Sequence, residues 1–390
     1  MHRAALLNRM RGALTVAGMT PRDALRSMRE ELQQLFLERA EVIDGALTAL
    51  LSGHHVLIIG PPGTAKSMLA DELCRRLEGA TYFQWLLTKF TTPEELFGAV
   101  SLSALERDEY RRVTTLKLPE AHIAFLDEVF KANSSILNAV LTLMNERRFH
   151  NGRAVEAVPL IALFGASNEL PEDDELQALY DRFLLRFVVS YIDEDFRFLK
   201  MLQARPPATR RGLSLETLRA AQAESASVVV PDALYRLLAD LRRELGGAQL
   251  VSSDRRYRQA LDVLRAHAYL DGRDRVVEED LFFLEHVLWR EPTERAEVRN
   301  VIHRLLRGYV DEAKALLYQT RELRDYAHRQ WENNELRGRA VVEAHTKIRH
   351  ILAKVDTILD GARGAGRPIE AVEAVRSEIE SIQHEMLAAL

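Results

Sequence analysis

The chain has 390 residues, of which 47% are hydrophobic and 28% charged, and its net charge is −5. This balance is typical of a soluble globular protein with more than one domain, and it gives no general attraction to nucleic acid or anionic lipid. The single cysteine, Cys74, excludes an internal disulfide and a cysteine-based zinc site, and it suits a reducing compartment.

The N-terminal residues 1–20 are expected to form a tail. Arg3, Arg9 and Arg11 interrupt its apolar residues, so we expect no signal peptide. No stretch of the chain approaches the roughly 20 apolar residues that a transmembrane helix needs. We therefore expect a cytoplasmic protein that is not bound to a membrane.

Residues 21–53 are predicted to be helical, because Pro21 follows Thr20 and apolar residues recur at helical spacing up to Gly53. The apolar run "HHVLIIG" then predicts a buried strand that ends at Gly60. A helix is expected over "KSMLADELCRRLEG", residues 66–79.

Further apolar runs predict four more strands: "TYFQWLL", "HIAFLDEVF", "VPLIALFGASN" and "LLRFVVSYI". Between the second and third lies "SSILNAVLTLMNERRF", a predicted helix with Ser134 or Ser135 near its N-cap. Apolar strands that alternate with helices indicate an α/β fold with a parallel sheet covered on both faces.

Beyond "ARPPATRRG", residues 204–212, the pattern is helical to about residue 290, and Pro292 marks another boundary. We expect an α/β core over 21–205, a helical lid over 206–291 and a helical domain over 292–390. Two long helices of this last part, separated by "GARGAGRP", carry apolar stripes made of Leu336, Ala340, Ala344, Ile348, Leu352, Val355 and Leu359, and of Ile369, Val372, Ile379, Ile382 and Met386.

The stretch "GPPGTAKS", residues 60–67, almost matches the phosphate-binding pattern of Gly, any four residues, Gly, Lys, then Ser or Thr. Only Ala65 departs from it. Between a strand and a helix such a loop directs backbone N–H groups at one spot, where phosphate binds. Lys66 could reach the outer phosphates, and the Ser67 hydroxyl could ligate Mg²⁺. An ordinary strand-turn-helix is the alternative.

Paired acids, Asp127 and Glu128, end another predicted strand. Asp127 would hold Mg²⁺, and Glu128 would orient and polarise the attacking water, as phosphoryl transfer requires. Asn168 ends a third strand and could hydrogen-bond the γ-phosphate or the water. Paired acids at a strand end are often merely solvated, and an Asn there often only forms a turn, so it is their order after the phosphate loop that favours ATP hydrolysis.

Arginines follow these elements. Arg182 precedes the last predicted strand in "LYDRFLLRF", and Arg255 and Arg256 open a helix in "SDRRYRQAL". Each could be an ordinary surface arginine, and only its place after the other motifs distinguishes it.

The ordered motifs "GPPGTAKS", "FLDE", "SNEL", "LYDRF" and "SDRR" resemble those of an AAA+ ATPase of the MoxR group, and most closely its RavA subfamily. The resemblance covers roughly residues 30–310. In this group the last Gly of the loop is commonly Ala, which accounts for Ala65. The nucleotide-binding loop that the resemblance implies consists of Gly60, Pro61, Pro62, Gly63, Thr64, Ala65, Lys66, Ser67 and Met68.

The resemblance also implies roles for single residues. Ser67 and Asp127 would hold Mg²⁺, Glu128 would be the catalytic acid and Asn168 the first sensor. Arg182 would be the arginine finger that reaches into a neighbouring subunit. Arg255 would be the second sensor, with Arg256 as its alternative. The helix over 35–50 would line the adenine pocket.

Two family insertions are expected at "LFGAVSLSALERDEYRRVTTLKLPEA" and "RRFHNGRAVEAVPL", and both would face the axis of a ring. The second resembles a hairpin whose "HNGR" supplies Asn-Gly turn chemistry.

By resemblance we expect a homo-hexamer that uses ATP and Mg²⁺ for chaperone-like remodelling or maturation of a protein partner, together with a von Willebrand factor A (VWA) domain protein. The client is not identified. RavA-type members are also linked to an acid-stress decarboxylase, but "GARGAGRP" is too short for the insertion that would contact it. Three alternatives stay open: a nucleic-acid motor or loader, which no basic stripe with interleaved aromatics supports; a metal-chelatase subunit; and a nucleotide-gated scaffold.

Overall fold

The computed structural model describes residues 13–15, 19–171, 174–193, 195–203, 210–328, 334–364 and 368–388. Contacts divide the chain into two units, one formed by Met1–Ala239 with Leu250–Arg295 and the other by Asp240–Gln249 with Ala296–Leu390. No helix among the described residues is both long and apolar enough to cross a bilayer.

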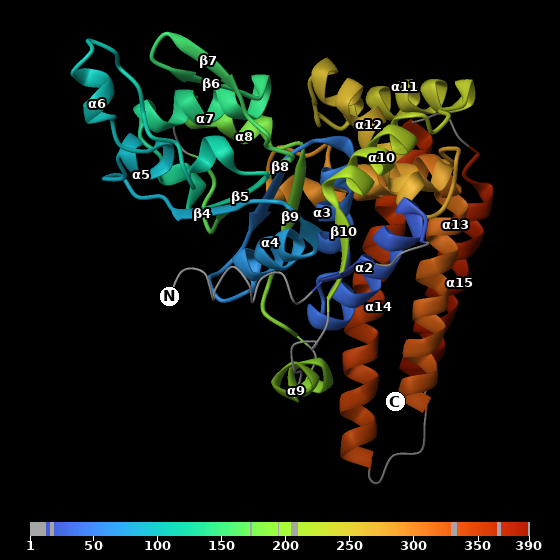
Figure 1. The fold of residues 1–390 in the computed structure, drawn as a ribbon. Coiled ribbons are helices and arrows are strands. Elements are labelled where there is room, and N and C mark those ends of the chain that lie inside the picture. Colours follow the sequence, from blue (N-terminus) through green and yellow to red (C-terminus); the bar gives the residue numbers. More distant parts are fainter. Residues whose placement is uncertain are drawn as a thin grey trace. The chain divides into compact units, whose positions relative to one another are not determined.

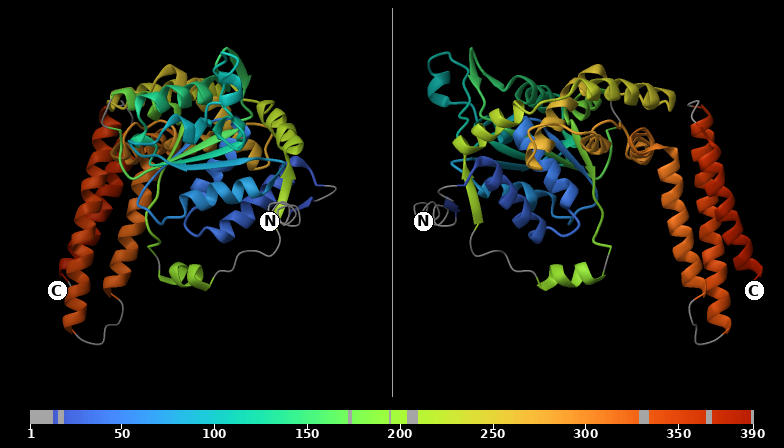
Figure 2. Two further views of the ribbon diagram at one scale, coloured as in Figure 1. Left: turned by 60° about the vertical axis from the view of Figure 1, so that its left-hand side comes forward. Right: turned by 90° about the vertical axis from the view of Figure 1, so that its right-hand side faces the viewer.

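The first unit is built on a five-stranded sheet in the order β4-β5-β8-β2-β9, and every neighbouring pair is parallel. Helices lie on both sides of the strands (Figures 1 and 2). Burial on both faces explains why β2, β5, β8 and β9 are mostly apolar, whereas the edge strand β4 is partly exposed. The parallel-sheet core is thus confirmed, with strands β2 (Val56–Ile59), β4 (Tyr82–Leu86), β5 (Ile123–Asp127), β8 (Ala162–Ser167) and β9 (Leu185–Val188).

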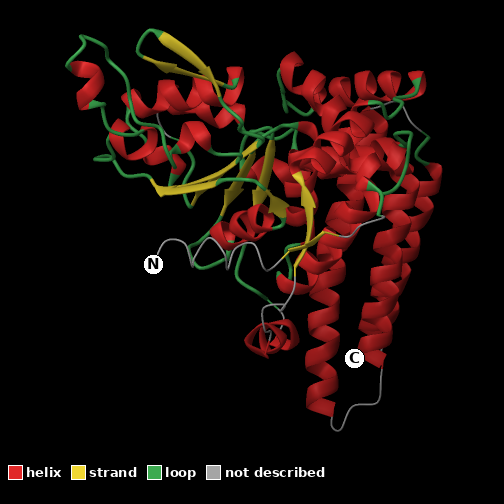
Figure 3. Ribbon diagram, in the orientation of Figure 1, coloured by secondary structure: helices red, strands yellow, loops and turns green. Residues whose placement is uncertain are grey.

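The helices of this unit that begin and end within it account for most of the red ribbon around the sheet in Figure 3. The longer ones are α2 (Pro21–Leu35), α3 (Ala40–Ser52), α4 (Lys66–Arg75), α7 (Ser134–Glu146), α8 (Asp174–Arg182), α9 (Asp195–Gln203), α10 (Leu215–Ala226), α12 (Asp254–Leu270) and the 3-10 helix η3 (Glu278–His286). Helix α11 (Asp232–Gly247) begins in the first unit and ends in the second.

The single helix predicted over residues 21–53 is wrong, because the chain turns between α2 and α3. Phe36 leaves α2 in an extended conformation, and Glu38 has a left-handed φ of 56°. Helix α3 buries most of its length, whereas α2 buries a stripe, and one straight helix could not place both against the same core. Helix α7 is also capped differently from the prediction. The Asn133 side chain, not that of a serine, accepts from the N–H of Ile136.

A second sheet, not predicted from the sequence, has the order β1-β10-β3. The helix expected to reach residue 79 ends at Arg75, because Leu77–Glu78 pairs as β3 with β10. Strand β10 (Arg210–Ser214) also pairs with β1 (Ala13–Thr15), so the segment expected to be wholly helical beyond the core opens with a strand.

The two predicted insertions lie together at one end of this unit (Figure 1). They contain the last two residues of α5 (Pro93–Phe97), all of α6 (Leu102–Leu105) and the antiparallel hairpin of β6 (Arg148–Asn151) and β7 (Ala154–Ala157).

The buried Asn151 side chain joins the two insertions. It accepts from the N–H of Arg112 and donates to the carbonyl of the same residue. The centre of the hairpin turn is Gly152-Arg153 and not Asn151-Gly152, since Asn151 still pairs with Ala154. Gly152 has φ 65°, and a Cβ there would lie 1.8 Å from the carbonyl oxygen of Tyr110. The close approach of the other insertion therefore requires glycine.

The second unit contains most of α13 (Arg295–His328), with α14 (Asn334–Gly364) and α15 (Glu370–Ala388). These long helices run side by side (Figure 2), and Gly308 breaks the helical conformation within α13. Both predicted stripes contribute to one core, although the side chain of Leu336 lies outside the described residues. Helix α14 continues to Gly364, so the predicted break begins later; residues 365–367 are not described.

Replacing Gly45 by Ala should destabilise the first unit. An added Cβ would lie 2.0 Å from Cζ of Phe187, whose ring is buried and lies 4.6 Å from the tilted ring of His286. Overpacking of this kind costs about 1–3 kcal/mol. The control is Gly338→Ala in α14, where the added Cβ meets nothing within 4 Å and should be neutral or stabilising. Urea unfolding followed by circular dichroism measures both; equal effects would contradict the packing argument.

Candidate active site

The carboxyl ends of β2, β8 and β5 meet at one edge of the sheet. Ile59 lies opposite Ser167 in the parallel register, and the N–H of Gly60 donates to the Ser167 carbonyl at 3.0 Å. Strand β5 pairs with the other side of β8. The loop after β2, Asn168 after β8 and the acids at the end of β5 therefore start from the same edge, as parallel pairing requires.

The loop between β2 and α4 has a backbone that explains its composition. Ala65 is left-handed, with φ 63° and ψ 24°, and forms the N-cap of α4. This conformation costs an ordinary residue about 1–2 kcal/mol, so glycine would be the easier choice and Ala65 is strained. Gly60 is fixed by packing, because a Cβ there would lie 2.2 Å from the carbonyl oxygen of Val189.

A row of backbone donors lies open in this loop. The first N–H of α4 with a carbonyl acceptor is that of Leu69, which donates to Ala65 at 3.1 Å. The preceding N–H groups have no acceptor among the described residues; they belong to Gly63, Thr64, Ala65, Lys66, Ser67 and Met68. Unpaired donors beside the positive end of a helix suit an anion. The loop therefore fits a polyphosphate.

The side chain of Lys66 folds back over the loop. Its Nζ donates to the carbonyl oxygens of Gly60 at 2.6 Å and Pro61 at 3.0 Å. Burial lowers the pKa of Lys66, against the opposing effect of the Asp127 and Glu128 carboxylates. The lysine thus lies within the electrostatic field of both acids, and its ammonium already covers carbonyl oxygens at the start of the loop.

The acids at the end of β5 lie in a tight turn. Oδ1 of Asp127 accepts from the N–H of Glu128 at 3.1 Å, and Glu128 is left-handed with φ 50° and ψ 47°. A left-handed residue other than glycine is uncommon and is often found at functional sites. Both side chains are half-buried, and Ser67 at the start of α4 is half-buried as well.

Asn168 is exposed directly after β8. The neighbouring Ser167 is buried, and its hydroxyl donates to the Glu169 carbonyl at 2.7 Å and accepts from the Glu169 N–H at 3.1 Å. Ser167 thus fixes the backbone on which Asn168 stands, between the phosphate loop and the acids.

The structure brings Arg182 and Arg255 together. Arg182 ends α8, and its buried Nε has no hydrogen-bond partner among the described residues. Burial lowers the pKa of Arg182, and the positive charge of Arg255 lowers it further. Arg255 is exposed in the first turn of α12 and donates to Oδ1 of Asn145 in α7 at 3.3 Å.

Arg256 has a different environment from its neighbour. It is 3% exposed, and its Nη2 donates to the Phe183 carbonyl at 2.8 Å. Burial lowers its pKa to about 9. This arginine is committed to holding α12 against the end of α8, so Arg255 is the better placed of the two to meet a ligand.

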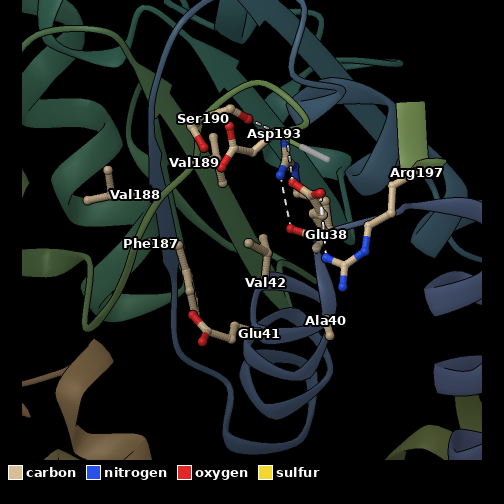
Figure 4. A pocket seen from close by; sticks show the side chains of 11 residues that line it. Glu38, Ala40, Glu41, Val42, Phe187, Val188, Val189, Ser190, Asp193 and Arg197 are labelled. Carbon is tan, nitrogen blue, oxygen red and sulfur yellow. Dashed lines mark hydrogen bonds and ion pairs between the residues drawn. The ribbon is translucent and has the colours of Figure 1, made fainter. Parts of the chain in front are cut away.

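A pocket of ≈ 450 Å³ lies beside the loop, between the start of α3 and the segment after β9 (Figure 4). Arg39 donates to the Ser190 carbonyl, and the N–H of Asp193 donates to Glu38 at 3.2 Å. Val189, which also lines the pocket, contacts Gly60 at the start of the loop. The sequence indicated the start of α3 but not the residues after β9, since no motif marks them.

Known proteins share this chain's domains. Residues 23–226 match the family model described as the MoxR domain in the MoxR-vWA-beta-propeller ternary systems, and residues 233–302 match an AAA lid domain. Two uncharacterized proteins of Methanocaldococcus jannaschii are similar along most of their length. One is 43% identical over 74% of this chain and 76% of its own, and the other is 38% identical over 92% of this chain and 97% of its own.

A named relative is Chaperone MoxR1 of Mycobacterium tuberculosis, 27% identical over 64% of this chain and 70% of its own. A crystal structure described as a putative ATPase from Cytophaga hutchinsonii has a TM-score of 0.60 at 18% identity, covering 74% of this chain and 94% of that one, and so shares the fold. The family model spans more than half of the chain, and the chain belongs to the MoxR group of AAA+ ATPases.

Proposed function

We propose that this chain binds ATP with Mg²⁺ at the edge where β2, β8 and β5 end, and hydrolyses it. The observation that carries the proposal is the row of unpaired N–H groups from Gly63 to Met68, with Lys66 beside it and the Asp127–Glu128 turn close enough to affect the lysine's pKa. Donors, a cation and acids at one point are what phosphoryl transfer uses.

Each residue then has a separate task. The loop N–H groups and Lys66 bind the phosphates, while the Ser67 hydroxyl and the Asp127 carboxylate hold Mg²⁺. The ion would neutralise charge on the phosphate oxygens when bound. Glu128 orients and polarises the attacking water. Asn168, which lies between the phosphate loop and the acids, hydrogen-bonds the water or the outer phosphate.

The pocket beside the loop is our candidate for the adenine site. It lies where the helix now seen as α3 begins, and Val189 joins it to the first glycine of the loop. Glu38 and Arg39 are held in place by backbone groups after β9. Polar side chains fixed in this way can select the edge of a base.

We further propose that Arg182 and Arg255 act together on the site of a neighbouring copy in a homo-hexameric ring. The support for this arrangement is that the charge of Arg255 acts on Arg182 and lowers its pKa. Arg182 would then be the finger and Arg255 the second sensor.

The description of the matching family names vWA and beta-propeller proteins, and one relative is named a chaperone. We therefore propose that the chain remodels or matures a protein partner in the cytoplasm, together with a VWA-domain protein. The motif order also leads us to place it in the RavA-like branch, without the decarboxylase partner. Residues 21–205 would form the motor core, 206–291 the lid, and 292–390 a module that docks the partner.

Lys66→Ala should abolish nucleotide binding, whereas Glu128→Gln should bind ATP and hydrolyse it very slowly. The lysine contributes charge to phosphate binding, but the glutamate acts on the water. Isothermal titration calorimetry and phosphate release measure the two properties, with Lys200→Ala on α9 as an exposed control. Equal loss of ATP binding in both site variants would contradict the assigned roles.

Arg182→Ala should leave ATP binding nearly intact and reduce turnover by about 10³-fold or more. Arginine fingers that act in trans contribute a factor on the order of 10³ to 10⁵ to kcat. Mixing this variant with Lys66→Ala should recover activity, because one site then combines an intact loop with an intact finger. No recovery in verified mixed rings would remove Arg182 from the trans role.

The same mixing design tests the pairing of the two arginines. Arg182→Ala mixed with Arg255→Ala should recover nothing, because every site would lack one of the two groups if they enter from the same subunit. Recovery would instead place them on opposite sides of the site.

Ile348→Ala should destabilise the helical module by about 2–5 kcal/mol and leave ATP turnover unchanged. Ile348 is fully buried in the core of α13, α14 and α15, and removing its side chain leaves a cavity. Val342→Ala, at a position 58% exposed on the same helix, is the matched control. Hydrogen exchange of α14 and steady-state ATPase assays measure the two effects; a parallel loss of turnover would assign the module to the motor.

A further inference from the structure

The carboxylate of Glu128 already has a partner in this structure. Its Oε2 lies 3.2 Å from Nζ of Lys131, three residues further on. The two residues are joined by one turn of 3-10 helix, η2 (Val129–Lys131), in which the N–H of Lys131 donates to the Glu128 carbonyl at 2.8 Å. This hydrogen bond closes the turn behind the left-handed Glu128 and brings the two residues close together. The backbone therefore holds the ion pair together.

The turn that carries this pair does not depend on it for its fold. Val129 is fully buried and Phe130 nearly so, and the ring of Phe130 packs 5.8 Å from that of Tyr180 in α8. The Asp127 side chain stabilises the start of the turn through the N–H of Glu128. Lys131 itself is 43% exposed, so removing its charge should not unfold the turn.

Glu128 thus interacts with two lysines in different ways. Lys66 lies over the phosphate loop and is affected by the charge of Glu128, whereas Lys131 contacts the carboxylate directly. A carboxylate oxygen that accepts from an ammonium group is less able to accept from a water molecule. A residue with no contact to the phosphate loop can therefore influence the water-activating group.

We propose that Lys131 is a positioning residue that restrains Glu128 and lowers the rate of ATP hydrolysis in the resting chain. The inference rests on the proposed function of Glu128. The carboxylate has two oxygens, and an exposed pair is weak, so the restraint is partial. Lys131 then sets how fast the site turns over without taking part in binding the nucleotide.

The test is Lys131→Met, assayed by steady-state phosphate release with the full chain. We expect kcat to rise about two- to five-fold, as the loss of one exposed ion pair allows, with KM unchanged. Lys131→Arg keeps the charge and should retain the wild-type rate. Lys89→Met, at an exposed lysine outside the turn, is the matched control, and thermal melting verifies that each variant is folded.

Repeating the comparison in the Glu128→Gln variant shows whether Lys131→Met acts through Glu128 or raises hydrolysis by another route. In Glu128→Gln, single-turnover hydrolysis with and without Lys131→Met should give the same rate, because the group being restrained is gone. An unchanged or lower kcat in Lys131→Met, or a rise that persists in Glu128→Gln, overturns the inference while the ATPase assignment stands. A wild-type chain that hydrolyses no ATP overturns both.

Discussion

Parallel pairing of β2 with β8, and of β8 with β5, is the constraint on which the site depends. Parallel strands end at the same edge, so three segments far apart in sequence deliver their polar ends to one place. The hydrogen bond from Gly60 to Ser167 fixes the loop to the middle strand at the point where both strands stop. From there Ala65 must turn into a left-handed conformation to open α4 with its N–H groups unpaired. The strain at Ala65 thus accompanies the row of unpaired N–H groups that opens α4.

Buried arginines brace the helix that carries Arg182. Arg186 donates to the carbonyls of Trp289 at 2.6 Å and Tyr180 at 3.1 Å, and Arg256 donates to that of Phe183 at 2.8 Å. Burying a guanidinium is costly unless its donors are satisfied. Carbonyl oxygens at the end of α8 and after η3 supply acceptors, so these two arginines secure the protein around Arg182. The Nε of Arg182 itself has no hydrogen-bond partner among the residues that the structure describes.

The sequence was sufficient wherever local pattern and burial agree. Strands β2, β5, β8 and β9 are buried along most of their length, so their apolar runs identified them, and the proposed site residues follow three of these strands. Pairings between distant segments were not accessible in this way. The short strand Leu77–Glu78 is fixed by β10, and Gly152 is required by the carbonyl of Tyr110, neither of which leaves a periodic pattern. The turn at Glu38 separates two helices for the same reason, since the core decides where each must lie.

The sequence did not indicate the pocket residues after β9, because they contribute to the pocket through backbone groups. Ser190 contributes a carbonyl and Asp193 an N–H, and any residue type could supply either group. The sequence did not indicate the ion pair between Glu128 and Lys131, because charged residues three apart are common. Only the left-handed turn at Glu128 makes this pair significant.

Electrostatics gives the arginine pair a further meaning. Arg182 is partly buried, and burial and the positive charge of Arg255 lower its pKa, while the Asp181 carboxylate acts in the opposite direction. An anion placed between the two arginines would relieve the repulsion and also satisfy the buried Nε. Groups fixed in advance around a position for negative charge stabilise it without reorganising.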